Sequence, residues 1–181
     1  EVDADFVKEK SPDVVVVATG GLRDTLGLSE TAGTKIVPLA DFLTADIGDK
    51  VVIAGSNAQA VDTALYLMAQ GKQVTMVTPD SMDDVDKGQS NWVKTFVMPT
   101  LYARGMRVWP HAEIKAVEDG SVVVSGETGV DITVACDTVI EAMDMLPDSS
   151  IADAVSGIET HVTGDCKKPW TIAEAIAAGN L

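Results

Sequence analysis

The chain has 181 residues, of which 46% are hydrophobic and 23% charged, and its formal net charge at pH 7 is −15. This length and composition describe one or two folded domains with a buried core and exclude an intrinsically disordered chain. The negative charge argues against nucleic acid and anionic membrane surfaces as partners. No apolar run approaches the roughly 20 residues of a membrane span, and no signal peptide is apparent. We therefore predict a cytoplasmic protein.

Cysteine and histidine, which often ligate metals, are scarce in this sequence. Cys136 and Cys166 form no C-x-x-C pair, which favours a reducing compartment and two small buried side chains over a redox centre. His111 and His161 have no carboxylate or thiolate at ligand spacing. No Ser, His and Asp group suggests nucleophilic catalysis. We predict no metal site and no catalytic side chain, so a cofactor would carry any redox chemistry.

The first strand predicted is the wholly apolar run Val14–Val17, which leads into the small-residue turn Thr19-Gly20. A buried strand needs neighbours, and no strand is predicted before this one. Its partners must lie later in the chain or be missing from it. Residues 22–49 contain several glycines and a proline, which indicates a turn-rich connection with one short helical turn near residues 38–43.

Residues 50–80 predict a strand, a tight turn, a helix and a second strand. Residues 51–54 are apolar and mostly β-branched, as in a strand covered on both faces. Apolar residues then recur at helical spacing from Val61 to Met68, Gly71 ends the helix, and residues 74–77 form the second strand. In such a βαβ unit the turn lies at a helix N-terminus, where unpaired N–H groups and the helix dipole favour a phosphate.

The turn of this unit departs from the G-x-G-x-x-G/A fingerprint of dinucleotide-binding folds. Its fingerprint positions are Gly55, Asn57 and Ala60, with Ser56 between the first two. Asparagine tolerates positive φ better than most residues, so we expect the turn geometry to survive, with the Asn57 side chain where pyrophosphate comes closest. The turn predicts dinucleotide binding on this unit. The alternative is a βαβ unit that merely packs.

The end of the second strand indicates which dinucleotide is preferred. An acidic residue there usually holds the ribose 2′-OH, whereas a nearby arginine accommodates a 2′-phosphate. The strand ends at Thr78, and no cation precedes Lys87. Four aspartates lie between them: Asp80, Asp83, Asp84 and Asp86. Because these carboxylates would repel a 2′-phosphate, the loop favours NAD(H) or ADP over NADP(H). The alternative is a simple solvated loop.

The rest of the chain predicts further elements of both kinds. Residues 90–104 have the pattern of an amphipathic helix that is kinked or broken near Pro99. The elements that follow are a short strand at 106–110, a β-meander at 113–118, 121–125 and 130–135, a buried strand at 137–140, a short helix at 149–155, a strand at 157–163 and a final helix at 171–178.

The last strand and the last helix are joined through Gly164 and Asp165. A strand, a Gly-Asp pair and a helix N-terminus form an anion-facing arrangement. The Asp165 carboxylate would face sugar hydroxyls rather than phosphate. The alternative is an aspartate that caps a helix or serves the structure.

Three landmarks in this order resemble the flavoprotein reductases that have two dinucleotide-binding domains: Ala18-Thr19-Gly20, the Gly55 turn and Gly164-Asp165. More closely, the chain resembles the C-terminal region of the 2,4-dienoyl-CoA reductase and trimethylamine dehydrogenase group of NADH:flavin oxidoreductases. The resemblance implies an α/β fold, in which a Rossmann-like three-layer NAD(P)-binding domain with a β-meander, residues 38–142, is inserted in a truncated FAD-binding-type domain, residues 1–37 and 143–181.

In this family, an N-terminal barrel that holds FMN and an iron–sulfur cluster performs the substrate chemistry. The C-terminal region either delivers electrons from NAD(P)H through FAD or merely holds ADP. By resemblance, Gly55, Asn57 and Ala60 lie under the pyrophosphate, Asp62 lies near the nicotinamide, and Thr78 ends the strand beside the ribose. The resemblance places four residues on the FAD side: Thr19, Gly20, Gly164 and Asp165.

The sequence departs from the family because two parts expected from the resemblance are not in it, which implies that the chain is a fragment of a longer polypeptide. The barrel and the first half of the FAD domain, which would be partners within the same polypeptide, precede the residues present here, so FAD would bind only in the full-length protein. The favoured hypothesis is an electron-input region that passes hydride from NADH to FAD and is inactive alone. The second is a non-catalytic ADP-holding module, which the Asn57 turn favours. A stand-alone NAD sensor would not need the two terminal landmarks. The sequence gives neither the substrate nor the oligomeric state.

Overall fold

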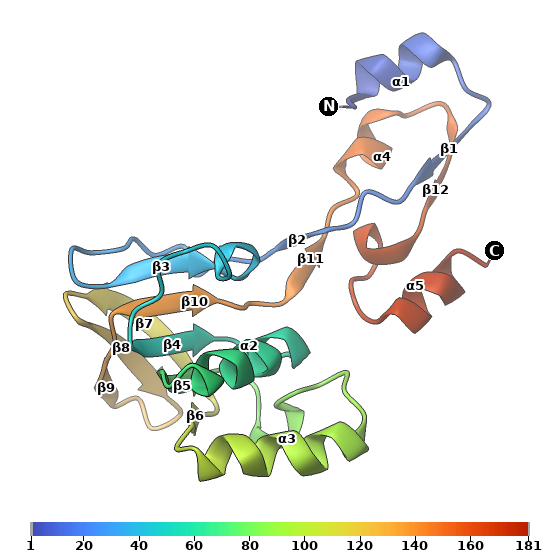
Figure 1. Ribbon diagram of the computed structural model, residues 1–181. Coiled ribbons are helices and arrows are strands. Elements are labelled where there is room, and N and C mark those ends of the chain that lie inside the picture. The colour runs from blue at the N-terminus through green and yellow to red at the C-terminus, as the bar shows by residue number, and fades with distance from the viewer. Residues whose placement is uncertain (1, 181) are drawn as a thin grey trace. The chain divides into compact units, whose positions relative to one another are not determined.

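A computed structural model describes residues 2–180 of the chain (Figure 1). These residues form two compact units, each described separately. Unit 1 combines the chain up to Asp24 with the chain from Met145 onward, and unit 2 is Thr25–Asp144. The domain boundaries expected from the sequence, after residues 37 and 142, remain predictions. Among the described residues, no helix is both long and apolar enough to cross a membrane.

Unit 2 is built on a five-stranded parallel sheet. Its strands, in spatial order, are β3 (Lys35–Pro38), β10 (Thr138–Glu141), β4 (Lys50–Ala54), β5 (Gln73–Val77) and β6 (Arg107–Trp109). Each neighbouring pair is parallel. The central strands read as apolar runs because both faces of the sheet are covered.

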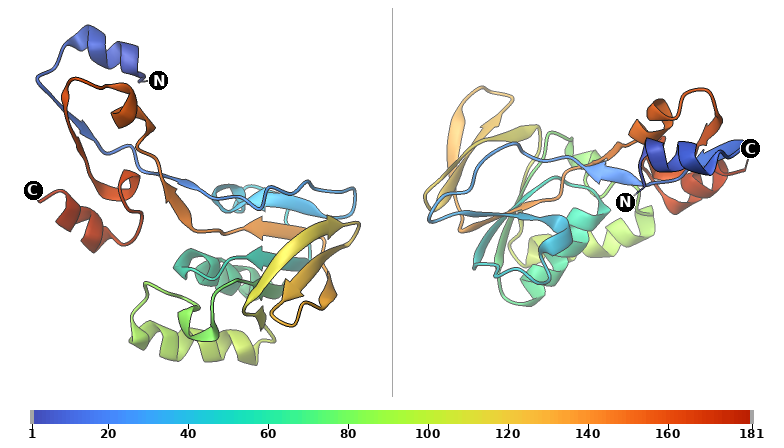
Figure 2. Two further views of the ribbon diagram at one scale, coloured as in Figure 1. Left: turned by 180° about the vertical axis from the view of Figure 1, so that it is seen from behind. Right: turned by 90° about the horizontal axis from the view of Figure 1, so that it is seen from above.

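Helices cover one face of this sheet, and an antiparallel meander covers the other (Figures 1 and 2). The helices are α2 (Ala58–Ala69) and α3 (Asn91–Ala103), and the meander is β7 (Ala112–Glu118), β8 (Ser121–Gly126) and β9 (Asp131–Ala135). Alternate residues of β4 serve the two cores: Ile53 packs toward the helices and Val52 toward the meander. This arrangement confirms the expected three-layer α/β fold.

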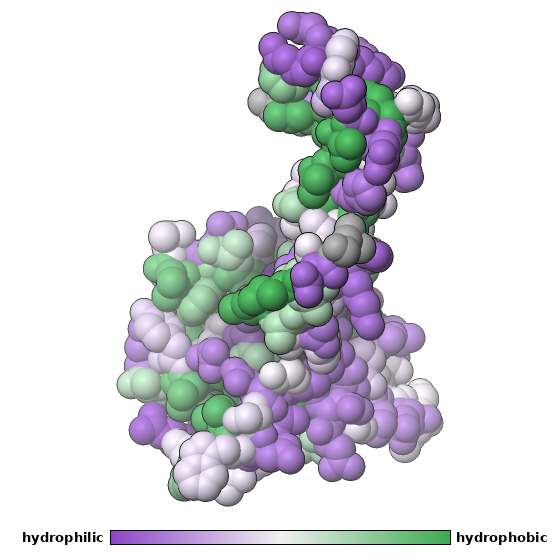
Figure 3. Space-filling model, turned by 90° about the vertical axis from the view of Figure 1, so that its right-hand side faces the viewer, coloured by the Kyte–Doolittle hydropathy of each residue, from purple (hydrophilic) through white to green (hydrophobic). Residues whose placement is uncertain are grey.

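Unit 1 consists of short elements. Strand β1 (Val14–Val17) pairs in parallel with β12 (Glu159–Val162), and β2 (Gly21–Arg23) pairs antiparallel with β11 (Met145–Pro147). The helices are α1 (Ala4–Lys10), α4 (Ser150–Ala154) and α5 (Ile172–Ala178). Much apolar surface of this unit stays exposed (Figure 3), including Val16 at 65% and Ile172 at 81%. The partner of β1 thus lies later in the chain.

Two local predictions need correction, and one helix was not predicted. Residues 22–49 are not only a connection, since β3 lies there and pairs with β10, and the helical turn is the 3₁₀ segment η1 (Leu39–Asp41). Helix α3 runs unbroken through Pro99, which is exposed. Helix α1 was not predicted because four of its seven residues are charged, yet Asp3 caps it by accepting a hydrogen bond from the N–H of Phe6 at 2.8 Å.

Gly55 gives the first testable prediction, because its φ is +119° and an added Cβ would lie 2.2 Å from the carbonyl oxygen of Ala142. Gly55→Ala should lower the free energy of unfolding by more than about 2 kcal/mol, since strain and a backbone clash add. Gly71→Ala is the matched control: φ is +85° but nothing lies within 4 Å of the added Cβ. We expect a loss of about 1 kcal/mol there. Equal losses in urea titrations would contradict this account.

Candidate functional site

The candidate site lies at the carboxyl edge of the parallel sheet in unit 2, where three strand ends meet. The turn after β4 begins at Gly55, whose N–H donates to the carbonyl oxygen of Val77 at the end of β5, at 2.8 Å. On the other side, Ala142 follows β10, and its N–H donates to the carbonyl oxygen of Ala54 at 2.9 Å. Ligands of open α/β sheets bind at this edge, beyond the carboxyl ends of the strands.

Asn57 is the N-cap of α2 and has φ of −67°, so the turn does not use the tolerance of asparagine for positive φ. Its Oδ1 accepts the N–H of Ala60 at 3.0 Å, and its Nδ2 donates to the carbonyl oxygen of Ala142 at 2.9 Å. The side chain thus uses one of the N–H groups that a helix N-terminus offers to an anion. It also ties the turn after β4 to the loop after β10.

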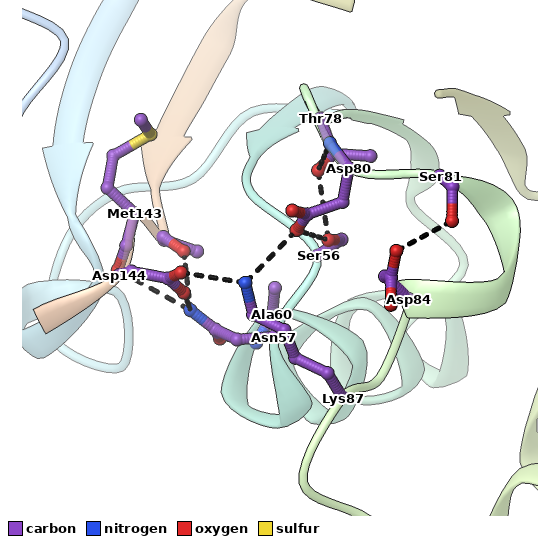
Figure 4. A network of polar contacts seen from close by, with 11 residues as sticks. Ser56, Asn57, Ala60, Thr78, Asp80, Ser81, Asp84, Lys87, Met143 and Asp144 are labelled. Carbon is purple, nitrogen blue, oxygen red and sulfur yellow. Dashed lines mark hydrogen bonds and ion pairs between the residues drawn. The ribbon is translucent and has the colours of Figure 1, made fainter. Parts of the chain in front are cut away.

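A network of polar side chains joins the three loops around Asn57 (Figure 4). The hydroxyl of Ser56 donates to Oδ2 of Asp80 at 2.8 Å, and the hydroxyl of the fully buried Thr78 donates to Ser56 at 2.9 Å. Lys87 Nζ lies 2.8 Å from Oδ2 of Asp144 and 3.4 Å from Oδ2 of Asp80. Asp144 and Asp80 hold the pKa of this ammonium above its usual value. Lys87 therefore bridges the loops after β10 and β5.

Asp86 is an unusual carboxylate beside this network. Its backbone has φ of +62°, its N–H donates to the carbonyl oxygen of Ser56 at 2.7 Å, and its side chain is 1% exposed. Neither carboxyl oxygen has a hydrogen-bond partner among the described residues. Burial raises the pKa of Asp86 to about 6; Lys94 opposes this rise and Asp62 adds to it.

The predicted site residues of unit 2 lie near one another at this edge. Gly55, Ser56 and Asn57 form the turn, Ala60 is buried in the first turn of α2, and Thr78 is buried at the end of β5. Asp62 is exposed on α2.

The predicted site residues of unit 1 lie at the carboxyl ends of β1 and β12, which the parallel pairing places together. The Thr19 hydroxyl donates to the carbonyl oxygen of Asp148 at 3.3 Å, and Gly20 and Gly164 have φ of +85° and +68°. Asp165 lies in the 3₁₀ segment η3 (Gly164–Cys166) and does not cap α5, whose N-cap is Thr171.

A family model described as pyridine nucleotide-disulphide oxidoreductase matches residues 11–165 of the chain, which is most of it. The chain belongs to this family. Its parallel sheet, with a glycine turn that leads from β4 into the N-terminus of α2, agrees with that assignment.

Similar proteins indicate which group of the pyridine nucleotide-disulphide oxidoreductases this chain resembles. A probable N-methylproline demethylase of Rhizobium meliloti is 39% identical over 84 residues, which are 43% of this chain and 12% of that protein. A solved 2-naphthoyl-CoA reductase in complex with 2-naphthoyl-CoA is 30% identical, with a TM-score of 0.78, over 99% of this chain and 28% of that one. Histamine dehydrogenase from Rhizobium sp. 4-9 shares the fold, at 19% identity and a TM-score of 0.79, over 99% of this chain and 31% of that one.

The resemblance to the FAD/NAD(P)-binding part of the 2,4-dienoyl-CoA reductase group is thereby confirmed. The chain spans about a third or less of these relatives. A flavin- and nicotinamide-binding redox role is the one that this oxidoreductase family supports.

The residues at the sheet edge fit a nicotinamide or adenine dinucleotide. Gly55 lets the turn approach Ala142 closely, and α2 begins behind it with its remaining N–H groups. A cavity of about 200 Å³ adjoins Gly55 on the meander side, between Leu26, Pro79 and Met143. In unit 1, the buried hydroxyl of Thr163 has no partner among the described residues, beside Gly164 with its positive φ. These groups fit one flank of a flavin dinucleotide.

Other expectations from the sequence can also be compared with the structure. Cys136 and Cys166 are both buried, and burial raises the pKa of the Cys136 thiol to about 12, so Cys136 is not a reactive thiolate. Among residues 2–180, no cluster of three or more His, Cys, Asp or Glu side chains could hold a metal. Sequence reasoning missed the roles of Lys87 and Asp144, because their pairing spans 57 residues of sequence.

The buried Asp86 gives a pH-dependent prediction. Its pKa in the folded protein, about 6, exceeds the value near 3.9 of an unfolded aspartate. The free energy of unfolding is therefore highest, as far as Asp86 decides it, below about pH 4, and it falls as the pH rises through 6. Asp86→Asn removes the charge, and asparagine also tolerates positive φ. We expect a gain of about 2 kcal/mol at pH 8 and almost none at pH 4, from urea titrations. The exposed Asp83→Asn is the control, and a pH-independent gain would contradict the assignment.

Proposed function

We propose that this chain is the electron-input region of a multidomain flavin oxidoreductase. NAD(P)H bound at the Gly55 edge would supply a hydride to FAD, and the electrons would continue to a barrel with FMN and an iron–sulfur cluster in the same polypeptide. The observation that carries the proposal is the close packing of the Gly55 turn against Ala142, at the carboxyl edge where α/β sheets bind nucleotides. The substrate and the cytoplasmic location remain predictions.

Each group at this edge has a distinct role in the proposal. The turn at Gly55 and Ser56 would pass beneath the pyrophosphate, while the start of α2 faces its charge; the N–H of Gly55 stays bonded to the carbonyl oxygen of Val77. Oδ1 of Asp80 takes no part in the Ser56 and Lys87 contacts, which use Oδ2, so it is available to a ribose hydroxyl. Asp62 would lie toward the nicotinamide. In unit 1, Thr19, Gly20, Gly164 and Asp165 would contact FAD once the preceding half of that domain is present.

The preference for NADH over NADPH follows from Asp80 and the neighbouring aspartates. Lys87 is a cation close to Asp80, and it would favour a 2′-phosphate if it were free. Two carboxylates already neutralise it, Asp144 at 2.8 Å and Asp80 at 3.4 Å. The loop as a whole therefore stays acidic, which favours an unphosphorylated ribose.

A second function, that of a non-catalytic ADP-holding module, is favoured by Asn57. Its side chain already occupies the N–H of Ala60 and crosses the turn to Ala142. A nucleotide must share or displace these contacts, which lowers affinity for a dinucleotide that has to reach a flavin. ADP held for structure alone would tolerate this arrangement.

Parallel calorimetric titrations of the chain with NADH, NADPH, ADP and FAD separate the two functions. The electron-input proposal expects NADH to bind more tightly than NADPH, and FAD to bind weakly in the absence of the first half of its domain. Binding of ADP with no added affinity for NADH would favour the holding module. No binding of any of the four would contradict both proposals for this site.

The substitution Asn57→Gly tests whether the Asn57 side chain lowers the affinity for NADH. Loss of the cap should cost up to about 1 kcal/mol of stability, since glycine is itself a tolerated N-cap. It frees the Ala60 N–H, so NADH should bind several-fold more tightly in calorimetry. Asn57→Asp is the matched control: it keeps the acceptor for Ala60 but replaces the donor to Ala142 with a negative charge, and should weaken binding. If Asn57→Gly leaves affinity unchanged, Asn57 does not attenuate the site.

A further inference from the structure

A cavity of about 850 Å³ lies at the edge of the unit 2 sheet opposite to Gly55. It is lined by the starts of β4, β5 and β6, the ends of α2 and α3, and strand β9. We call it the basic groove and define it by Lys50, Arg104, Arg107, Trp109 and residues 132–135. Strand β4 runs from Lys50, which lines the basic groove, to Ala54, which precedes Gly55 at the candidate site. The basic groove and the candidate site therefore lie at opposite ends of this strand.

The charge of the basic groove is opposite to that of the chain. The sequence holds 28 acidic and 13 basic residues, yet four cations and no acidic residue line the groove. Lys72 is used internally, because its Nζ donates to the carbonyl oxygens of Ile47 at 2.7 Å and Gly48 at 2.9 Å. Lys50, Arg104 and Arg107 are exposed. Within residues 2–180 these three form no ion pair, so their charges are available to a ligand.

The groove also presents an unpaired strand edge. Strand β9 is the last of the meander, with β8 on one side only. Four consecutive residues, 132–135, line the groove. A strand face would contribute alternate residues, so it is the free edge of β9 that borders the groove. This edge contains neither proline nor lysine, which commonly protect exposed edges.

The hydrogen-bond register shows which backbone groups this edge offers. The N–H of Cys136 donates to the carbonyl oxygen of Gly120 at 3.0 Å, so this pair faces inward between β9 and β8. Antiparallel pairs alternate, and Val134 opposite Val122 is again an inward pair. The N–H and C=O of Thr133 must therefore point away from β8. They are ready to pair with an added strand.

We propose that the basic groove binds an extended, acidic polypeptide segment that adds to β9 as a further strand. Its backbone would pair with Thr133, and its carboxylates would meet Arg104, Arg107 and Lys50. Apolar side chains on its alternate positions would contact Trp109, Ile132 and Val134. A polypeptide explains both features, because a small anion would use the cations but leave the strand edge unpaired.

A labelled peptide of alternating Glu and Val tests the proposal by fluorescence anisotropy with the 181-residue chain. The charge arm uses the double variant Arg104→Gln and Arg107→Gln, which should weaken binding about tenfold or more, as expected for two lost charge contacts. Lys115→Gln, which removes an exposed cation of β7 outside the groove, is the matched control and should change nothing. Added salt should weaken binding, because exposed charges are screened.

The backbone arm uses Thr133→Pro, which removes an N–H that points away from β8 and should spare the fold but weaken peptide binding. A peptide with N-methylated backbone positions tests the same point without altering the protein. Two outcomes would overturn the proposal: no binding of the peptide at low salt, or equal binding of the N-methylated peptide. In the second case, complete competition by inorganic pyrophosphate would identify a small-anion site instead.

Discussion

The fit of Gly55 against the carbonyl of Ala142 is the constraint on which the rest of unit 2 depends. A side chain at residue 55 would place its Cβ 2.2 Å from that oxygen, so β4 and β10 can end side by side only with glycine there. Because the strands are parallel, the loops that follow them all begin at the same edge of the sheet. The close approach at Gly55 lets three loops converge there and places the start of α2 behind them. Stability and site geometry therefore rest on the same contact.

Asn57 uses the same turn for contacts that hold the fold together. With glycine at this position, the first N–H groups of α2 would face an incoming phosphate. The asparagine instead satisfies the N–H of Ala60 and fastens the loop after β10 through Ala142. Lys87 links the same loops a second time through its ion pairs with Asp144 and Asp80. A nucleotide at this edge would meet a surface whose polar groups already have partners, so its affinity must come from replacing these contacts.

The sequence predicted the features that depend on local patterns. Periodicity identified the βαβ unit and the meander, and the Gly55 position stood out because a tight turn needs glycine. Strand β3 was missed because Lys35–Pro38 is short and has only two β-branched residues between a lysine and a proline, and its pairing with β10 makes it a strand. The fingerprint suggested only that Asn57 could tolerate the place of a glycine, and its role as the N-cap of α2 was not predicted. Lys87 and Asp144 lie far apart in sequence, so no spacing could reveal their pairing.

The two edges of the unit 2 sheet carry opposite charges, and helix dipoles account for only part of this. The ends of α2 and α3 reach the N-terminal edge, where cations stabilise the partial negative charge of helix C-termini. Arg104 is the C-cap residue of α3 and has this role, whereas Lys72 after α2 donates to the carbonyl oxygens of Ile47 and Gly48. Arg107 and Lys50 begin strands and gain nothing from a helix end. Their presence beside the free edge of β9, with no acidic residue in the lining, is explained by an acidic partner better than by the fold alone.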